Sequence, residues 1–191
     1  MKKIIFILVI FFVVSAVSLS AWEGKDLTKF PPCMNEKNWI LNLGIGLGLD
    51  SFDHIGDDKI WFPPVRLSFD KNVGIGDNNL PFFFGGIIRY TGHGHKKHNY
   101  YYHVIGLGFR AGYHFNWAVD KLDTYAVTTA GWTVYAGDND WAPSKAGSAM
   151  VGVNLGARWF VSDGFGFWVE AGTGHILDFV PHFDIGFAFK F

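Results

Sequence analysis

Apolar and polar residues alternate along most of this chain with a period of two. From Trp39 to Asp50, large apolar side chains at odd positions alternate with mostly small or polar residues at even positions. A period of two predicts a β-strand with one apolar face and one small or polar face. Its length exceeds the usual five or six residues of soluble strands and fits the roughly 9–11 that a tilted strand needs to cross a bilayer.

The same alternation recurs and predicts eight strands in all. Four further segments are as regular as the first: 101–115, 149–159, 165–173 and 183–191. Three fit the pattern less cleanly: 65–70, 82–91 and 122–135. An even number of antiparallel strands that close on themselves leaves no open edge, as in bacterial membrane barrels. We therefore expect an all-β fold over residues 38–191, an eight-stranded antiparallel up-and-down transmembrane β-barrel.

The segments between the predicted strands are of two kinds. Long polar connections are predicted at 51–60, 92–99, 136–147 and 174–180, and tight ones at 116–121 and 161–164. Short turns on one side and long loops on the other are typical of outer-membrane barrels whose two chain ends face the periplasm. Residues 71–79 depart from this pattern, because they are long for a periplasmic turn.

The two faces of the predicted strands differ in charge. The positions assigned to the interior hold five cationic and five anionic residues: Arg66, Arg89, Arg110, Arg158 and Lys190, and Asp50, Asp70, Asp123, Glu170 and Asp184. Eight strands enclose a space just wide enough for side chains, so the aromatic face must lie outside, against lipid. Because an unpaired charge in the interior is costly, the balance of signs predicts a lumen filled by ion pairs. Arg158 and Glu170, on either side of the turn 161–164, are expected within ion-pair reach of one another.

The N-terminus has the features of an export signal. Met1-Lys2-Lys3 precedes an apolar run over residues 4–17 and a stretch of small residues ending at Ala21. This order predicts a cleaved signal peptide over residues 1–21, because a run of about 14 residues is shorter than the roughly 20 of a transmembrane helix. An uncleaved N-terminal anchor is the alternative. Residues 22–37 would form a periplasmic tail, in which Cys33 is a solvated linker residue; as the single cysteine it cannot form an intrachain disulfide.

Composition excludes several classes of function. Of the 191 residues, 18% are aromatic and only 17% are charged, whereas about 25% are charged in soluble domains. The net charge is −1, and loss of Lys2 and Lys3 with the signal peptide would make it −3. This charge is too mild to indicate nucleic-acid binding or the steering of charged substrates. We expect a monomer without a cofactor.

One constellation has the character of a metal site. His93, His95 and His98 occur within six residues of a predicted loop, and three imidazoles can hold Zn²⁺ or Cu²⁺ if the loop folds back. Lys96 and Lys97 lie between them and would repel a cation. A solvated polar loop is therefore the favoured interpretation, and we expect no metal.

The C-terminus carries a resemblance to a known family. Residues 184–191 place a polar residue first, a glycine two residues later and aromatic residues up to the end of the chain. This order is similar to the assembly signal of outer-membrane proteins, and with 156–160 and 169–172 it resembles the small barrels typified by OmpX, the OmpA transmembrane domain and the opacity proteins. By this resemblance the barrel-assembly machinery would recognise Asp184, Gly186, Phe189 and Phe191. The alternative is that these are ordinary residues of the last strand.

The resemblance implies a compartment and leaves the function open, because such barrels serve as adhesins, enzymes and scaffolds. Lipid A deacylases of similar architecture carry a His followed two residues later by a Ser, and no His-x-Ser occurs here. Residues 22–37 also lack the amphipathic helix of lipid A palmitoyltransferases. We expect a non-enzymatic protein of the outer membrane, embedded in its lipid, with a filled lumen and loops that contact an extracellular ligand. The alternative is a narrow pore or an OmpW-like transporter of small hydrophobic molecules.

Overall fold

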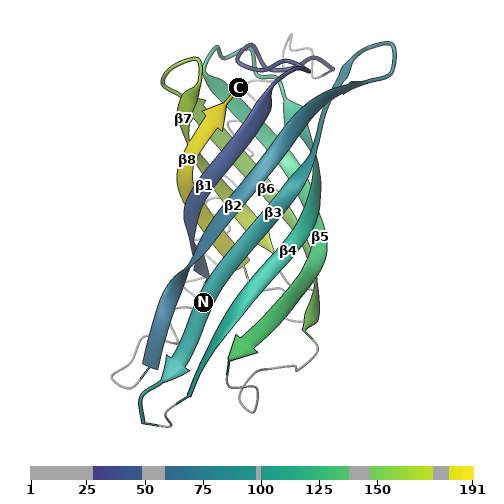
Figure 1. Cartoon of the computed structure of the whole chain (residues 1–191). Helices are drawn as coiled ribbons and strands as arrows, with labels where there is room; N and C mark the ends of the chain where they lie inside the picture. The colour runs from purple at the N-terminus through teal and green to yellow at the C-terminus, as the bar shows by residue number, and fades with distance from the viewer. Residues whose placement is uncertain (1–27, 49–58, 98–99, 138–146, 174–180) are drawn as a thin grey trace, which may run out of the picture.

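The described residues form a closed β-barrel. The computed structural model describes residues 28–48, 59–97, 100–137, 147–173 and 181–191. Their strands are β1 (Trp39–Gly48), β2 (Lys59–Ile75), β3 (Leu80–His95), β4 (Tyr100–Phe115), β5 (Leu122–Gly137), β6 (Ser148–Phe160), β7 (Phe165–Thr173) and β8 (Pro181–Lys190). Each pairs antiparallel with its neighbours in sequence, and β8 pairs with β1 (Figure 1). The predicted eight-stranded up-and-down barrel is confirmed. No helix among the described residues is long and apolar enough to cross a membrane.

The seam between the first and last strands is tightly paired. Trp39 and Phe191 exchange backbone hydrogen bonds of 3.0 and 2.9 Å beyond the paired strands. Gly44 and Gly186 are register partners across this seam, and a Cβ on either would collide with the backbone of the other strand. Close approach of two backbones therefore explains the glycine at 186 on structural grounds alone.

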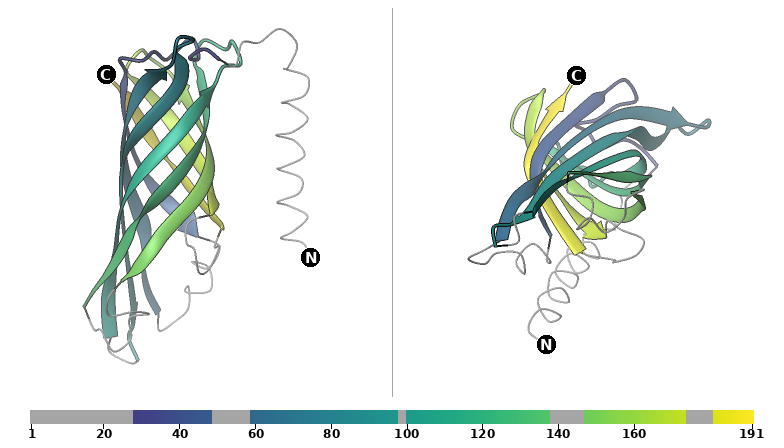
Figure 2. Two further views of the ribbon diagram at one scale, coloured as in Figure 1. Left: turned by 90° about the vertical axis from the view of Figure 1, so that its right-hand side faces the viewer. Right: turned by 60° about the horizontal axis from the view of Figure 1, so that its bottom comes forward.

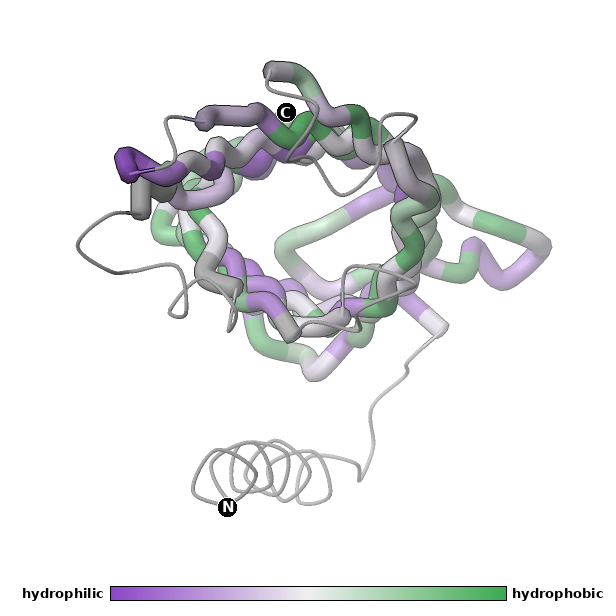
Figure 3. The backbone as a smooth tube through the Cα atoms, turned by 90° about the horizontal axis from the view of Figure 1, so that it is seen from below, coloured by the Kyte–Doolittle hydropathy of each residue, from purple (hydrophilic) through white to green (hydrophobic). Residues whose placement is uncertain are grey.

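Side chains alternate between the two faces of the wall as predicted. On β6, Val153 is 58% exposed on the outer face, whereas the next residue, Asn154, is 4% exposed inside. Viewed along the barrel, apolar and polar residues alternate around the whole ring (Figure 3). Asp123 and Tyr125, in the less regular segment 122–135, are also buried. The outer face is thus apolar and the lumen is polar.

The predicted long connection at 71–79 is wrong. β2 continues to Ile75 and β3 begins at Leu80, which leaves a turn of four residues. The alternation is hidden there because Lys71 faces outward at the rim, where its Nζ donates to the carbonyl of Lys37 and lies 5.0 Å from the centre of the Trp39 ring.

Four strands extend beyond the others at one end. β2 to β5 have 16 or 17 residues, whereas β1 and β6 to β8 have 9 to 13. The extra length lies at the end opposite the C-terminus (Figures 1 and 2). We call residues 59–62, 92–95, 100–104 and 134–137 the protruding sheet. The alternation of residues does not predict the extra length of β2, because the register shifts between Phe62 and Val65, at Pro63 and Pro64.

Residues 28–38, here called the N-terminal segment, lie across the other end, beside the C-terminus (Figures 1 and 2). Met34 is buried there in a cluster of apolar side chains: Ile40, Phe160, Trp168 and Ala188. Phe30 and Cys33 pack against the same cluster, and the carbonyl of Cys33 accepts a 2.7 Å hydrogen bond from the amine of Lys190.

The prediction that Cys33 is a solvated linker residue is therefore wrong. The N-terminal segment shields the apolar side chains at this end of the lumen from water. Burial is the main reason that the pKa of the Cys33 thiol is raised to about 12. The predicted signal peptide lies outside the described residues.

Candidate functional site in the lumen

The predicted interior charges that the structure describes lie inside the barrel, and most are completely buried. Seven are at most 2% exposed: Arg66, Arg110, Arg158, Asp70, Asp123, Glu170 and Asp184. The side chain of Arg89 is 20% exposed near the protruding sheet. Lys190 is half-buried at the opposite end, under the N-terminal segment. Asp50 lies outside the described residues.

The half of the lumen nearer the C-terminus holds a ladder of alternating charges. His114 Nδ1 lies 2.6 Å from Asp123, whose other oxygen accepts a 2.7 Å bond from Arg158. Arg158 reaches Asp70 at 2.9 Å, and Asp70 lies 3.1 Å from Arg110. These five side chains come from four strands, so the ladder ties opposite walls of the barrel together.

The ladder continues into the other half without a break. Arg110 binds Glu170 at 2.9 Å, and Glu170 binds Arg66 at 2.5 Å. Arg66 also pairs with Asp184, which accepts a further bond of 2.7 Å from Arg89. The eight charges from Asp123 to Arg89 are four arginines and four carboxylates, and every carboxylate has at least two cationic or imidazole partners.

Neutral polar side chains complete this ladder. Asn42 accepts from Arg158 Nε at 2.9 Å and donates to Ser68 and Asp70. Asn154 and Tyr125 each donate a 2.9 Å bond to Glu170. The guanidinium of Arg158 also lies 4.1 Å from the centre of the Tyr125 ring.

The expected pair of Arg158 with Glu170 is not made. The register places Arg158 opposite Trp168 and Glu170 opposite Gly156, so the two residues face inward one diagonal step apart. Each binds other partners instead, and the guanidinium of Arg66 lies 5.1 Å from the centre of the Trp168 ring. Trp168 is 1% exposed, and the alternation of residues predicts no role for it.

Asn72 is a further member of the hydrogen-bond network for which the sequence predicted no role. Asn72 accepts from His114 Nε2 at 3.0 Å and donates to the carbonyl of Asn35 in the N-terminal segment, so it links the ladder to the cover. It lies in the stretch that was interpreted as a loop. Its even position, in phase with Asp70, was the available signal.

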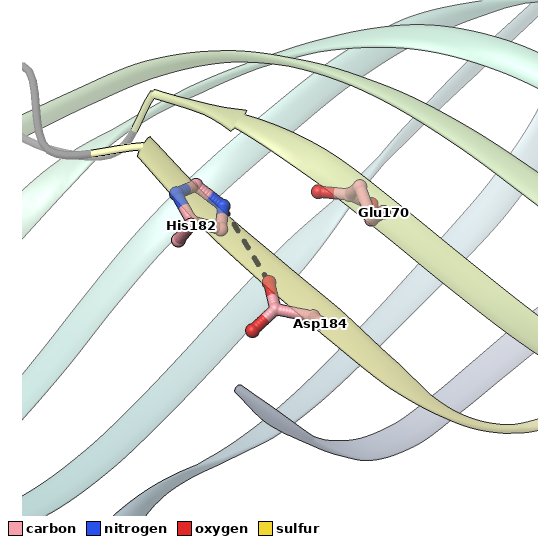
Figure 4. Close-up of side chains that lie close together, drawn as sticks. All are labelled: Glu170, His182 and Asp184. Carbon is pink, nitrogen blue, oxygen red and sulfur yellow. Dashed lines mark ion pairs between the residues drawn. The ribbon is translucent and has the colours of Figure 1, made fainter. Parts of the chain in front are cut away.

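Glu170, His182 and Asp184 form the one group among the described residues with metal-like spacing (Figure 4). Their ligand atoms lie within 4.8 Å of one another, with His182 Nε2 3.5 Å from Asp184. Arg66 bridges both carboxylates and Arg89 holds Asp184. Guanidinium groups at this distance would strongly oppose a divalent cation in a buried site. The group is therefore part of the ion-pair ladder rather than a metal centre.

A small cavity lies beside this group, toward the protruding sheet. It has a volume of about 10 Å³, close to that of one water-sized sphere, and Arg89, Asn154 and His182 contribute to its walls. Within the described part of the chain, both ring nitrogens of His182 and Oδ1 of Asn154 have no hydrogen-bond partner. Polar atoms at this end of the lumen thus lack hydrogen bonds, although Nε2 of His182 remains within ion-pair distance of Asp184.

The protruding sheet holds two of the candidate metal ligands. His93 and His95 lie in β3, so their predicted place in a loop is wrong; His98 is outside the described residues. The His93 ring stacks on Tyr102 at 5.5 Å, and the His95 ring lies 6.0 Å from that of Tyr100. The two imidazoles therefore belong to an aromatic array on one face, and the expectation that they bind no metal stays a prediction.

The residues of the expected assembly signal separate into two groups. Asp184 and Gly186 have structural roles, in the ladder and at the seam. Phe189 lies 5.5 Å from the ring of Phe165, and Phe191 is 69% exposed at the rim. Recognition by the assembly machinery stays a prediction for all four.

No family model and no curated protein matches the sequence. The N-terminal β-barrel domain of Pseudomonas aeruginosa OprF is similar in structure, with a TM-score of 0.53 and 10% identity, over 83% of this chain and 100% of that one. A structure described under the de novo design of transmembrane β-barrels has a TM-score of 0.47 and 13% identity, over 83% of this chain and 98% of that one. The similarity to the OprF domain shows a shared barrel fold.

Proposed function

We propose that this protein is an integral outer-membrane barrel that acts as a non-enzymatic scaffold with a lumen filled by side chains. The observation that carries the proposal is the ladder of eight charges that bind one another inside a barrel with an apolar outer face. Charges that neutralise one another across so narrow a space do not line an aqueous path.

The outer face supports the membrane location. Phe109 on β4 is 82% exposed and Leu155 on β6 is 52% exposed, and in water such a surface would favour aggregation. A closed barrel satisfies its backbone hydrogen bonds internally, which a bilayer requires. The export signal and C-terminal pattern favour the outer membrane, with the N-terminal segment in the periplasm and the protruding sheet outside the cell.

The protruding sheet supports a role in surface interactions. Its rings at Tyr100 and Tyr102 stack 6.4 Å apart, and Lys96 and Lys97 are exposed beside them. Half-exposed aromatic side chains supply large contact areas at low entropic cost, as in many binding surfaces. We place the contact with an extracellular ligand here and in the adjoining loops.

Conductance across a planar bilayer tests the filled lumen. We expect wild-type protein to show no steady conductance. The double variant Arg66→Ala/Glu170→Ala removes a neutral pair from the middle of the ladder and should conduct measurably, which confirms insertion of the barrel. Steady, ion-selective steps of porin size from the wild type would refute the proposal and favour the narrow-pore alternative.

A further inference from the structure

A groove lies on the outer face of the barrel, around Gly86 of β3. Its register partners are Phe69 on β2 and Phe109 on β4, so large side chains flank a position that has none. The groove has a volume of about 530 Å³, and its walls are apolar: Leu67, Phe69, Ile88, Leu107, Phe109 and Trp132.

The depression at Gly86 is open space rather than a close contact. A Cβ placed there would meet only the carbonyl oxygen of Gly108, at 3.8 Å. This differs from Gly85, its neighbour on the inner face, where a Cβ would collide with the backbone of Phe69. The ring of Phe109 does not cover the gap, since 82% of that residue is exposed.

The height of the groove on the barrel restricts what can fill it. Gly85 pairs with Asp70 and with Arg110, both in the middle of the charge ladder, so the groove lies midway along the wall. If the outer face spans a membrane, this level is the hydrocarbon core, beyond the reach of lipid headgroups and water. No charged side chain lines the groove.

We propose that this groove binds one hydrocarbon chain of a membrane lipid in an ordered position. The inference rests on the proposed function, because it requires the outer face to lie in a bilayer. Burial from water gives no driving force there, so binding depends on the dispersion contacts that an aliphatic chain makes with three walls instead of one. Strand pairing is continuous from β2 to β5 behind the groove, so the chain stays outside the lumen.

Nuclear Overhauser contacts in lipid nanodiscs test the proposal. Methyl-labelled protein in phosphatidylcholine nanodiscs should show stronger contacts from chain methylenes to Leu107 and Ile88 than to Val169, an outward residue of β7. Gly86→Leu, whose Cβ would meet only the carbonyl oxygen of Gly108, places a side chain in the groove and should abolish this excess. Ala171→Leu adds the same side chain at an exposed position of β7 and should preserve it.

The outcomes separate the inference from the function on which it rests. Equal lipid contacts at Leu107 and Val169 in the wild type would overturn the ordered chain while leaving the membrane barrel intact. Absence of lipid contacts at both residues would overturn the membrane location as well. In a sample that mixes labelled and unlabelled protein, contacts to Leu107 from another protein molecule would assign the groove to a second copy of this chain instead.

Discussion

The two halves of the lumen contain the same kinds of residues but differ in how completely these are bonded. In the half under the N-terminal segment, all three guanidinium nitrogens of Arg158 donate to side chains, and both ring nitrogens of His114 are bonded. Among the described residues, Nη1 of Arg110 near the middle of the lumen has no hydrogen-bond partner. In the half under the protruding sheet, Nε of Arg89 and both nitrogens of His182 have no hydrogen-bond partner among the described residues.

The two ends also differ in how far the described residues cover them. The N-terminal segment covers its end with Phe30 and Met34, so polar groups beneath it must be satisfied by protein atoms. At the other end, the side chains of Arg89 and His182 are 20% and 9% exposed. We infer that the side chains under the N-terminal segment are held more rigidly than those under the protruding sheet.

The largest expected effect is in the covered half. Arg158→Ala leaves Asp70 and Asp123 buried with one partner fewer each, and should lower the free energy of unfolding by about 3–5 kcal/mol. Urea titration of the protein refolded in detergent micelles measures the loss. A change below about 1 kcal/mol would show that water reaches these carboxylates.

Cys33, which packs against the apolar cluster at the end of the lumen under the N-terminal segment, should react slowly with thiol reagents. A thiol pKa of about 12, against the ordinary 9.0, gives a thiolate fraction lower by about three powers of ten at neutral pH. Maleimide labelling of the folded protein should be slower than that of the urea-unfolded chain by about this factor. Since the folded pKa is the higher one, the stabilisation is complete below pH 9 and is lost as the pH rises toward 12. Rapid labelling would mean that the N-terminal segment does not cover the lumen.

A smaller effect is expected in the open half. Arg89→Ala removes one bond to Asp184, which keeps Arg66 as its partner. The loss should be about 1–2 kcal/mol in the same urea titration, because Arg89 is partly solvated. If Arg89→Ala and Arg158→Ala destabilise the protein equally, the two halves do not differ.

The smallest effect concerns the outside of the cover. The pKa of Glu36 is lowered, chiefly because Asn79 donates a 2.9 Å hydrogen bond to its carboxylate. The stabilisation from this contact is therefore present at neutral pH and is lost as the pH falls through the lowered value. Asn79→Ala should move the pKa of Glu36 back toward its ordinary range, as followed by carboxyl NMR shifts. An unchanged pKa would show that this contact does not form in solution.

The alternation of residues was enough to predict the barrel and most inward positions. The alternation failed where a residue breaks it. Lys71 is a charged residue that faces outward, and Pro63 and Pro64 lie where the register of β2 shifts. The alternation predicted equal numbers of positive and negative charges in the lumen but not which charges pair. The pairs depend on which side chains from different strands lie at the same level along the barrel axis. Glu170 thus binds Arg66 and Arg110, 104 and 60 residues away, rather than the nearer Arg158.

The N-terminal segment was the part least accessible to prediction. It has no regular secondary structure and therefore no periodicity. Phe30 and Met34 are single apolar residues in a polar and proline-containing stretch. Phe30 and Met34 pack on side chains from several strands, and these come together only in the closed barrel. The sequence alone therefore does not predict their burial.

The seam between β1 and β8 also sets the order of events as the protein folds. Asn38 and Phe191, which meet there, are 153 residues apart in the sequence. Hairpins of neighbouring strands can pair early, but this contact requires the whole chain, and such distant contacts make folding slow. Until β8 arrives, β1 and β8 present unpaired edges that invite aggregation. We therefore expect ring closure to be the last step in forming the barrel wall, and the two edges to be open to aggregation until it occurs.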